Sequence, residues 1–262
     1  MTRAQRLQRI VDLVVESGSI HIDAIIETLG VSAATARRDL DELASQQLVI
    51  RTRGGALANS TTGDVPLRYR GATRTSAKQA IARAVADMTK PNQVVAFNGG
   101  TTTTTAAYEL GVRVAAEPDV FGKHFTVVTN AVNIAADLAI RPQIRVVVTG
   151  GVARPKSYEL VGPLSDLILP QINIDVLFLG VTAVDTVEGL FTPREDEAAI
   201  GAALVAAARR TVVITDSSKI NTTAFARICT FEQVDAMITD TEANPDDLAT
   251  IAAHGVEVIT VS

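Results

Sequence analysis

The feature that most constrains the fold is a regular alternation of short apolar runs and helical stretches over residues 76–262. The runs expected to be strands are Val94–Phe97, Phe125–Thr129, Arg145–Thr149, Asp175–Val181, Thr211–Thr215, Ala236–Thr239 and Val256–Val261. The helical stretches between most of them are 76–89, 102–110, 131–140, 195–209 and 245–254. Strands that are apolar almost throughout are buried on both faces, and the connecting helices supply that cover. The sequence therefore predicts an α/β domain with a mainly parallel sheet.

The N-terminal residues follow a different pattern. Apolar residues at helical spacing, with Ser32 as a suitable N-cap for the third helix, predict helices over 3–16, 23–29 and 32–46. Residues 48–53 alternate as a strand and lead into the turn signal Gly54-Gly55. Three helices followed by a strand and a turn are typical of a winged helix-turn-helix domain.

Small, polar and turn residues separate the two patterns, which is typical of a linker. We predict a winged helix-turn-helix DNA-binding domain, a linker and an α/β effector-sensing domain over residues 1–58, 59–75 and 76–262, respectively.

Composition excludes several classes of protein. Of the 262 residues, 47% are apolar and 20% are charged, which excludes disorder over most of the length. The longest uncharged apolar run, Ala198–Ala208, is too short to span a membrane. A single cysteine, Cys229, fits a reducing compartment, and the N-terminus lacks an export signal, so we expect a cytoplasmic location. Three scattered histidines offer no zinc spacing, so we expect neither a metal nor another cofactor.

Charge is unevenly distributed along the chain. The net charge is −5, and residues 57–262 carry all of it, because residues 1–56 are neutral. Every basic residue in that first segment is an arginine, and an arginine fork fits phosphate oxygens and guanine edges. An arginine-biased genome would produce the same composition. The positions of these arginines along the helices therefore have to decide whether they bind nucleic acid.

The strongest local signal for DNA binding lies in residues 31–40. Small residues at 33, 34 and 36 would let a helix approach the groove closely. Arg37 and Arg38 fall on neighbouring faces, so one can reach a phosphate while the other reaches a base. Asp39 is expected either to orient an arginine or to lie near the arginine side chains of the first helix. The predicted DNA-binding residues are Ser32, Thr35, Arg37, Arg38, Arg51 and Arg53. The alternative is a helical oligomerisation domain with a solvated arginine face.

Polar residues and glycines follow several of the predicted strands. Asn98-Gly99-Gly100-Thr101-Thr102 joins a strand to a helix, so backbone N–H groups and hydroxyls surround one point that suits a phosphate or a carboxylate. The alternative is an ordinary strand-to-helix turn. Ligands of parallel α/β sheets bind at the carboxyl ends of strands, where we also place Thr129, Asn130, Gly150, Gly151, Arg154 and Lys219.

These motifs occur in a recognisable order. Ser32-x-x-Thr35-x-Arg37-Arg38-Asp39-Leu40, followed by Val49-Ile50-Arg51-x-x-Gly54-Gly55-Ala56, closely resembles the N-terminal domain of DeoR-type bacterial transcriptional regulators. The resemblance continues through the second domain. It implies a sensor fold similar to ribose-5-phosphate isomerase, in which a phosphorylated sugar binds and changes operator affinity. The resemblance also adds Glu197, at the start of a later helix, to the predicted effector-binding residues.

Three positions depart from the pattern of that family. Asn98 stands where the family often has Asp, Val181-Thr182-Ala183 replaces the usual Thr/Ala-Asp-Gly, and Gly201 replaces a usual Lys. A lost acid and a lost base suggest an altered effector, or a weakened response to sugar phosphates.

We therefore expect a non-catalytic repressor of carbohydrate metabolism genes that binds double-stranded operator DNA as a dimer or tetramer and responds to a phosphorylated sugar. A sugar-phosphate isomerase-like enzyme carrying a DNA-binding domain is the second hypothesis. Asp216, Glu197 and Lys219 would then be the candidates for acid–base chemistry. A constitutive DNA-binding scaffold with a degenerate pocket is the third.

Overall fold

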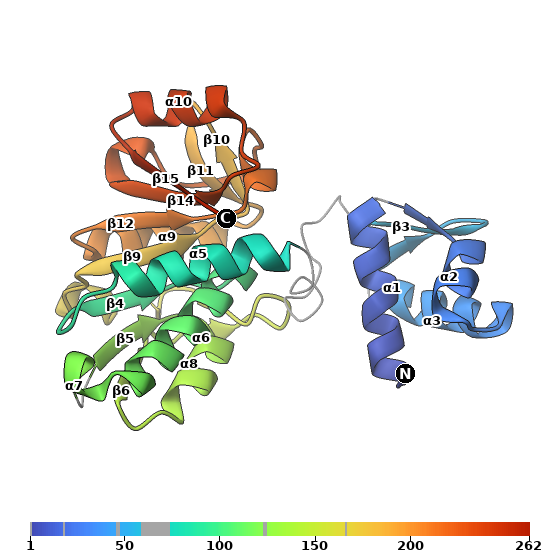
Figure 1. The fold of residues 1–262 in the computed structure, drawn as a ribbon, viewed down its shortest axis with the longest axis horizontal. Coiled ribbons are helices and arrows are strands. Elements are labelled where there is room, and N and C mark those ends of the chain that lie inside the picture. Colours follow the sequence, from blue (N-terminus) through green and yellow to red (C-terminus); the bar gives the residue numbers. More distant parts are fainter. Residues whose placement is uncertain (1, 18, 46–47, 59–73, 123–124, 166) are drawn as a thin grey trace. The chain divides into compact units, whose positions relative to one another are not determined.

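The computed structural model describes residues 2–17, 19–45, 48–58, 74–122, 125–165 and 167–262. The chain divides into two compact units, Met1–Thr73 and Arg74–Ser262 (Figure 1). Most of the predicted linker, residues 59–73, lies outside the described residues, so the predicted domain limits stay predictions.

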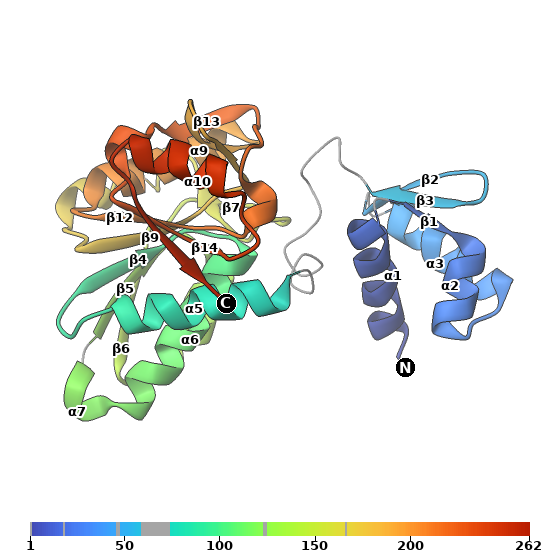
Figure 2. The same cartoon turned by 45° about the horizontal axis from the view of Figure 1, so that its top comes forward.

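The described residues of the first unit form three helices and a small antiparallel sheet (Figure 2). Its elements are α1 (Arg3–Ser17), β1 (Ser19–His21), α2 (Ile22–Leu29), α3 (Ala33–Ser45), β2 (Val49–Arg51) and β3 (Gly55–Ala58). The strands pair in the order β1-β3-β2. The predicted winged helix-turn-helix pattern is therefore present, and β3 completes the wing after the glycine turn. Gly55 allows this pairing, because a Cβ there would lie 1.9 Å from the carbonyl oxygen of Ile20.

The second unit is built on a seven-stranded sheet with the order β15-β14-β12-β9-β4-β5-β6. All neighbouring strands in it are parallel, which confirms the predicted fold class. The strands are β4 (Val94–Phe97), β5 (Phe125–Thr129), β6 (Ile144–Val148), β9 (Val176–Gly180), β12 (Thr211–Ile214), β14 (Ala236–Asp240) and β15 (Glu257–Val261). The helices are α5 (Thr75–Met88), α6 (Thr101–Ala116), α7 (Pro118–Phe121), α8 (Val132–Ala139), α9 (Glu195–Ala207) and α10 (Pro245–Ala253).

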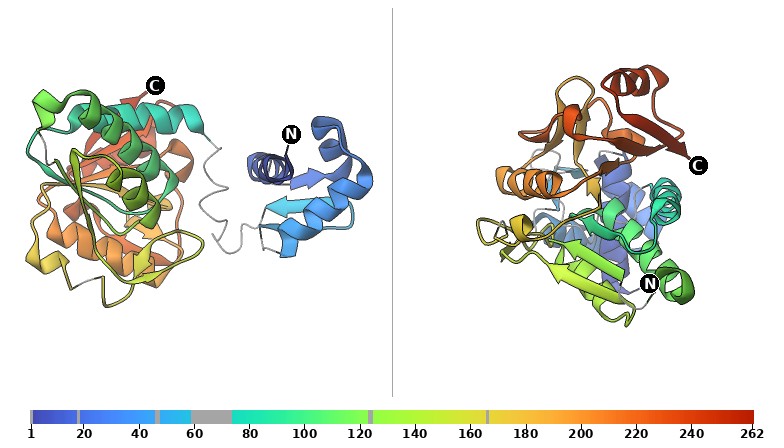
Figure 3. Two further views of the ribbon diagram at one scale, coloured as in Figure 1. Left: turned by 90° about the horizontal axis from the view of Figure 1, so that it is seen from below. Right: turned by 90° about the vertical axis from the view of Figure 1, so that its left-hand side faces the viewer.

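Successive residues of the central strands enter different cores, as the twofold repeat of a strand requires. Phe97 and Phe178 pack into the core beneath α5, α6 and α8, with their rings stacked 5.5 Å apart. Ala96 and Leu177 belong to the opposite core, which contains residues of α9 and α10. Helices therefore cover both faces of the sheet (Figure 3).

Two small antiparallel additions were not predicted. A hairpin joins β7 (Val152–Ala153) to β8 (Leu160–Val161), and a three-stranded sheet has the order β10-β11-β13. Its strands are β10 (Ala183–Asp185), β11 (Gly189–Thr192) and β13 (Ala226–Cys229). These strands are only two to four residues long, so they carry no periodic apolar run that a sequence pattern can detect.

The strand order reverses its direction of growth between β4 and β9. From β4 the chain builds outward through β5 and β6, whereas β9, β12, β14 and β15 extend the sheet on the other side. Such a switch point is the usual place for a ligand in a parallel α/β sheet, at the carboxyl ends of the two strands. The ends concerned here are Phe97-Asn98 and Gly180-Val181.

Candidate functional site

Helix α3 carries the residues predicted to read DNA. Ser32 caps it, since its Oγ accepts a hydrogen bond from the Thr35 amide at 3.2 Å, and the two hydroxyl oxygens lie 2.9 Å apart. Arg37 and Arg38 are exposed, and neither forms an ion pair with any described residue. Both guanidinium groups are therefore available to an anionic partner.

Three ion pairs among the described residues hold α3 in place. Arg6 donates from Nε to Asp39 Oδ2 at 2.5 Å and from Nη2 to Oδ1 at 3.1 Å, and Asp39 is buried. Hydrogen bonding to Asp39 raises the pKa of Arg6 above its ordinary value. The other two pairs are Arg3–Glu42 and Arg51–Asp41. As expected, Asp39 orients an arginine of the first helix.

The two arginines predicted on the wing differ in their surroundings. Arg51 donates to Asp41 on α3 at 2.8 Å and to the Gly55 carbonyl at 2.7 Å, so its side chain braces the turn. Arg53 lies in the turn between β2 and β3 and is exposed, with no ion pair to a described residue. Of the two, Arg53 has the freer guanidinium.

The predicted anion loop at the end of β4 is bound to two other segments. Asn98 donates to the carbonyl oxygen of Gly180 at 2.8 Å and accepts from its amide at 2.7 Å, which joins the ends of β4 and β9. The Gly99 amide donates to Oε1 of Glu159 at 3.0 Å, and the same carboxylate accepts from Asn130 at 3.3 Å. The structure therefore brings Asn98, Gly99 and Asn130 together, although the side chain of Asn98 is already hydrogen-bonded to Gly180.

Glu159 was not predicted as a site residue. It is buried, and a Cβ on Gly99 would lie 2.2 Å from its Cγ, so the carboxylate packs directly on the glycine loop. The segment around Glu159 contains no periodic pattern that would have placed it there.

The first turn of α6 offers further donors. The structure gives the N–H groups of Gly100, Thr101 and Thr102 no hydrogen-bond partner among the described residues. The hydroxyls of Thr103, Thr104 and Thr105 each donate to a backbone carbonyl oxygen three or four residues earlier in the chain. By contrast, the Thr102 hydroxyl is buried and has no partner in the described part of the chain.

The next two strand ends were also predicted to contribute. Thr129 is fully buried, and its hydroxyl accepts from the Ala131 amide at 3.0 Å. Gly150 accepts at its carbonyl oxygen from the Ser165 hydroxyl at 2.9 Å. Gly151 has a φ of +117°, and a Cβ there would lie 2.2 Å from Ser165 Oγ, so only glycine fits this turn.

The two predicted cations both have protein partners. Arg154 pairs with Asp196 at 2.6 Å and with Glu197 at 3.2 Å, which ties the β7–β8 hairpin to the start of α9. Glu197 also accepts from the Thr192 hydroxyl at 3.1 Å. Lys219 donates to the carbonyl oxygen of Val181 at 2.9 Å, so it joins the loop after β12 to the end of β9.

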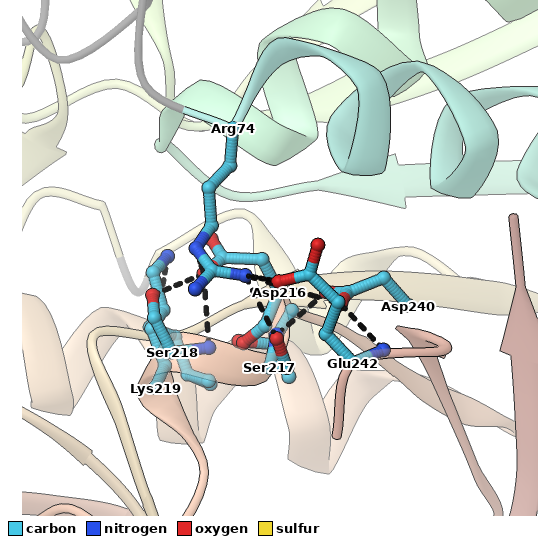
Figure 4. Close-up of polar contacts among 9 residues, drawn as sticks. Arg74, Asp216, Ser217, Ser218, Lys219, Asp240 and Glu242 are labelled. Atoms are coloured by element: carbon cyan, nitrogen blue, oxygen red, sulfur yellow. Dashed lines mark hydrogen bonds and ion pairs between the residues drawn. The ribbon is translucent and has the colours of Figure 1, made fainter.

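Asp216, which the sequence analysis named, lies in a cluster of ionic groups whose other members were not predicted. Arg74 lies within 4.0 Å of Asp216, Asp240 and Glu242 (Figure 4). Burial alone would raise the pKa of Asp240, but hydrogen bonds from Ser217 and from the Glu242 amide hold it below its ordinary value. Arg74 could not be foreseen, because it is distant in sequence from all three acids.

Comparison with known proteins now identifies the two units. Residues 6–62 match the DeoR-like helix-turn-helix domain, and residues 73–241 match the DeoR C terminal sensor domain. The chain belongs to the DeoR family. The predicted resemblance is thereby confirmed.

Several DeoR-family regulators are similar over nearly the whole chain. The HTH-type transcriptional regulator GlpR of Haloferax volcanii is 34% identical over 260 residues, covering 99% of this chain and 98% of that protein. The glycerol-3-phosphate regulon repressor of Escherichia coli K12 is 28% identical, covering 98% of this chain and 99% of that protein. Among solved structures, ribose 5-phosphate isomerase A of Methanocaldococcus jannaschii is 18% identical with a TM-score of 0.42, covering 56% of this chain and 55% of that one.

Two of the three departures from the DeoR pattern lie at strand ends, and the third lies within α9. Asn98 bridges β4 to β9, and Val181 supplies the carbonyl oxygen that Lys219 binds. Gly201 lies in α9, where a Cβ would be 3.0 Å from Ile228 of β13. All three positions therefore hold neighbouring elements together. No helix among the described residues is long and apolar enough to cross a membrane.

Proposed function

We propose that this DeoR-family regulator represses carbohydrate metabolism genes by binding double-stranded operator DNA, and that a phosphorylated sugar or related metabolite changes its operator affinity. The observation that supports DNA binding best is the contrast among the arginines of the first unit. Arg3, Arg6 and Arg51 are used to hold α3, whereas Arg37 and Arg38 on α3 are exposed without ion pairs to described residues. A fixed helix with free guanidinium groups suits the major groove.

The cluster of Asn98, Gly99, Asn130 and Glu159, which we call the strand-end cluster, supports an anionic effector. Helix α6 begins beside it, and its first-turn N–H groups favour a negatively charged group. Three buried polar atoms nearby have no partner among the described residues, namely Thr102 Oγ1, Asn130 Oδ1 and Ser157 Oγ. Buried polar atoms are normally hydrogen-bonded, so a ligand or water has to complete them. The predicted effector residues Asn98, Gly99, Gly100, Thr101, Thr102, Thr129, Asn130, Gly150, Gly151, Arg154, Glu197 and Lys219 are retained as this proposal.

An isomerase-like activity is the second candidate, and the contacts favour it less. Asp216 and Glu197 are the carboxylates that could act as bases, but Asp216 accepts from Ser218, and Glu197 binds both Thr192 and Arg154. A general base needs a lone pair directed at the substrate proton. We therefore propose a non-catalytic sensor, in a homo-oligomer whose symmetry matches that of the operator.

The test uses the full chain and a fragment of its own promoter. We expect a band shift that one of glycerol 3-phosphate, ribose 5-phosphate or glucosamine 6-phosphate alters, and a rise in melting temperature with the same compound. Turnover of ribose 5-phosphate or glucosamine 6-phosphate would favour the enzyme. DNA binding that no compound alters would refute the proposed sensing.

A further inference from the structure

Arg74 occupies a backbone position that local rules do not favour for arginine. It immediately precedes α5 and is the N-cap of that helix, with a φ of 50° and a ψ of 43°. Left-handed backbone is uncommon outside glycine, asparagine and aspartate. Its side chain makes no capping hydrogen bond, and a positive charge is unfavourable at a helix N-terminus. Contacts of the guanidinium group have to compensate for all three features.

Those contacts lie at the carboxyl ends of two neighbouring strands. Nη1 donates to Ser217 Oγ and to Glu242 Oε2, both at 2.9 Å (Figure 4). Arg74 Nε lies 3.8 Å from Oδ1 of Asp216, which follows β12, and Nη1 lies 4.0 Å from Oδ1 of Asp240, which ends β14. The guanidinium group therefore spans both strand ends.

The two aspartates depend on this cation. Both are buried, and Arg74 is the one cation that the described residues place within 4.0 Å of either carboxylate. Asp240 also accepts from the Ser217 amide at 2.7 Å, and Asp216 accepts from Ser218. Without Arg74, the two buried carboxylates would lose the cation that lies within 4.0 Å of them, and the Asp216–Lys219 loop would lose its hydrogen bond from Arg74 to Ser217.

We propose that Arg74 is a positioning residue that fixes the Asp216–Lys219 loop to the start of α5 and thereby couples an anion bound at this loop to the segment leading to the DNA-binding domain. The inference rests on the proposed function, since it takes Lys219 as a ligand of the effector anion. An anion that draws Lys219 and Ser217 toward itself acts on the hydroxyl that Arg74 binds. The backbone of Arg74 directly follows residue 73, so the change reaches the chain that joins the two units.

The test replaces Arg74 by the residue that local rules prefer. Asparagine tolerates left-handed backbone and caps helices, so Arg74→Asn should leave α5 intact while removing the guanidinium contacts. Arg83→Asn is the matched control, because Arg83 is an exposed arginine of the same helix outside the cluster. Glu242→Gln removes one exposed negative charge but keeps an oxygen that can accept from Arg74, so it serves as a milder second variant.

Two measurements are made on each full-length variant with glycerol 3-phosphate, ribose 5-phosphate and glucosamine 6-phosphate as probes. One is the rise in melting temperature that a probe causes, and the other is the ratio of operator Kd with and without that probe. In the wild-type protein we expect the probe to change the operator Kd about fivefold or more. Arg74→Asn should keep the rise in melting temperature, but its ratio of operator Kd values should lie within about twofold of one. Arg83→Asn should keep both, and Glu242→Gln should show a partial loss of the ratio.

A third measurement does not depend on the choice of probe. Coupling between sites is reciprocal, so operator DNA should change hydrogen exchange in residues 215–220 of the wild-type protein but not of Arg74→Asn. An unchanged Kd ratio in Arg74→Asn overturns the coupling role. The coupling role is also overturned if operator DNA leaves hydrogen exchange in residues 215–220 of the wild-type protein unchanged. If no probe affects the wild type in either assay, the proposed sensing itself fails, and this inference fails with it.

Discussion

The replacement of Asp39 by asparagine tests whether the recognition helix is held by a buried ion pair. The Arg6 and Asp39 side chains are 17% and 3% exposed, and two hydrogen bonds join them. Removing one partner of a buried pair costs about 3–5 kcal/mol. Because Arg6 keeps some contact with water, we take the lower end, about 3 kcal/mol. This corresponds to a rise of about 150-fold in the unfolded fraction of the domain.

A loss of that size is large for a small domain. At about 0.05–0.15 kcal/mol per residue, residues 1–58 would have a free energy of unfolding of about 3–9 kcal/mol. Asp39→Asn should therefore leave α3 close to local unfolding at 37 °C, with faster hydrogen exchange in residues 33–45 and a weaker operator complex. The sensor unit, which shares no described contact with Asp39, should keep its melting transition.

Asp41→Asn provides the matched control. Asp41 is also an acid of α3 paired to an arginine, but its pair with Arg51 is exposed, at 65% for Asp41 and 31% for Arg51. Exposed pairs contribute at most about 1 kcal/mol, so exchange in α3 should rise by less than about fivefold. Both variants remove one negative charge, so any general effect on DNA affinity is common to them. Equal exchange rates in the two variants would show that burial of the Arg6–Asp39 pair is irrelevant.

Three further outcomes are expected. Arg38→Ala should weaken operator binding about tenfold or more without changing stability, and the salt slope should fall by about one if Arg38 binds a phosphate; unchanged binding in a salt titration would exclude the role. Lys219→Ala should keep operator affinity but weaken the binding of an active sugar phosphate about tenfold, as measured by calorimetry, and unchanged ligand affinity would remove Lys219 from the site. Burial raises the pKa of Cys229 to about 12, so the folded protein should not react with a thiol reagent at pH 8, whereas the unfolded protein should. The raised pKa also means that its contribution to stability is complete below about pH 9 and is lost as the pH rises toward 12, which alkaline melting curves would reveal.

The sequence predicted the parts of the fold that have a strong periodic signal. Strands such as Val94–Phe97 and Phe125–Thr129 were predicted with the limits that the structure gives them, because uninterrupted apolar residues are required on a sheet covered on both faces. The β7–β8 hairpin and the β10-β11-β13 sheet could not be predicted. The strands of two to four residues are too short to show a periodic pattern, and β11 pairs with β13 across a long separation in sequence, as in Phe191 opposite Arg227.

The position that we propose for the effector site follows from topology, whereas its contacts do not. Glycine and polar residues after parallel strands must lie at one edge of the sheet, because the carboxyl ends of parallel strands share that edge. The sequence could not show that Glu159 packs on Gly99 or that Arg154 is paired with Asp196 and Glu197. These partners lie on segments whose approach is decided by tertiary packing. Arg154 and Lys219, the two predicted cations, therefore already have protein partners that an anionic effector would have to share or displace.

Two departures from the family pattern have a common structural effect. An aspartate at position 98, when ionised, could accept from the Gly180 amide but could not donate to its carbonyl oxygen, whereas Asn98 does both. A lysine at position 201 would place its Cβ 3.0 Å from Ile228, so Gly201 lets α9 and β13 pack closely. In each case the residue present holds or allows a close contact between neighbouring elements where the family pattern has an ionisable side chain. Neither Asn98 nor Gly201 can act as a general acid or base, so these two positions supply nothing to the isomerase-like alternative.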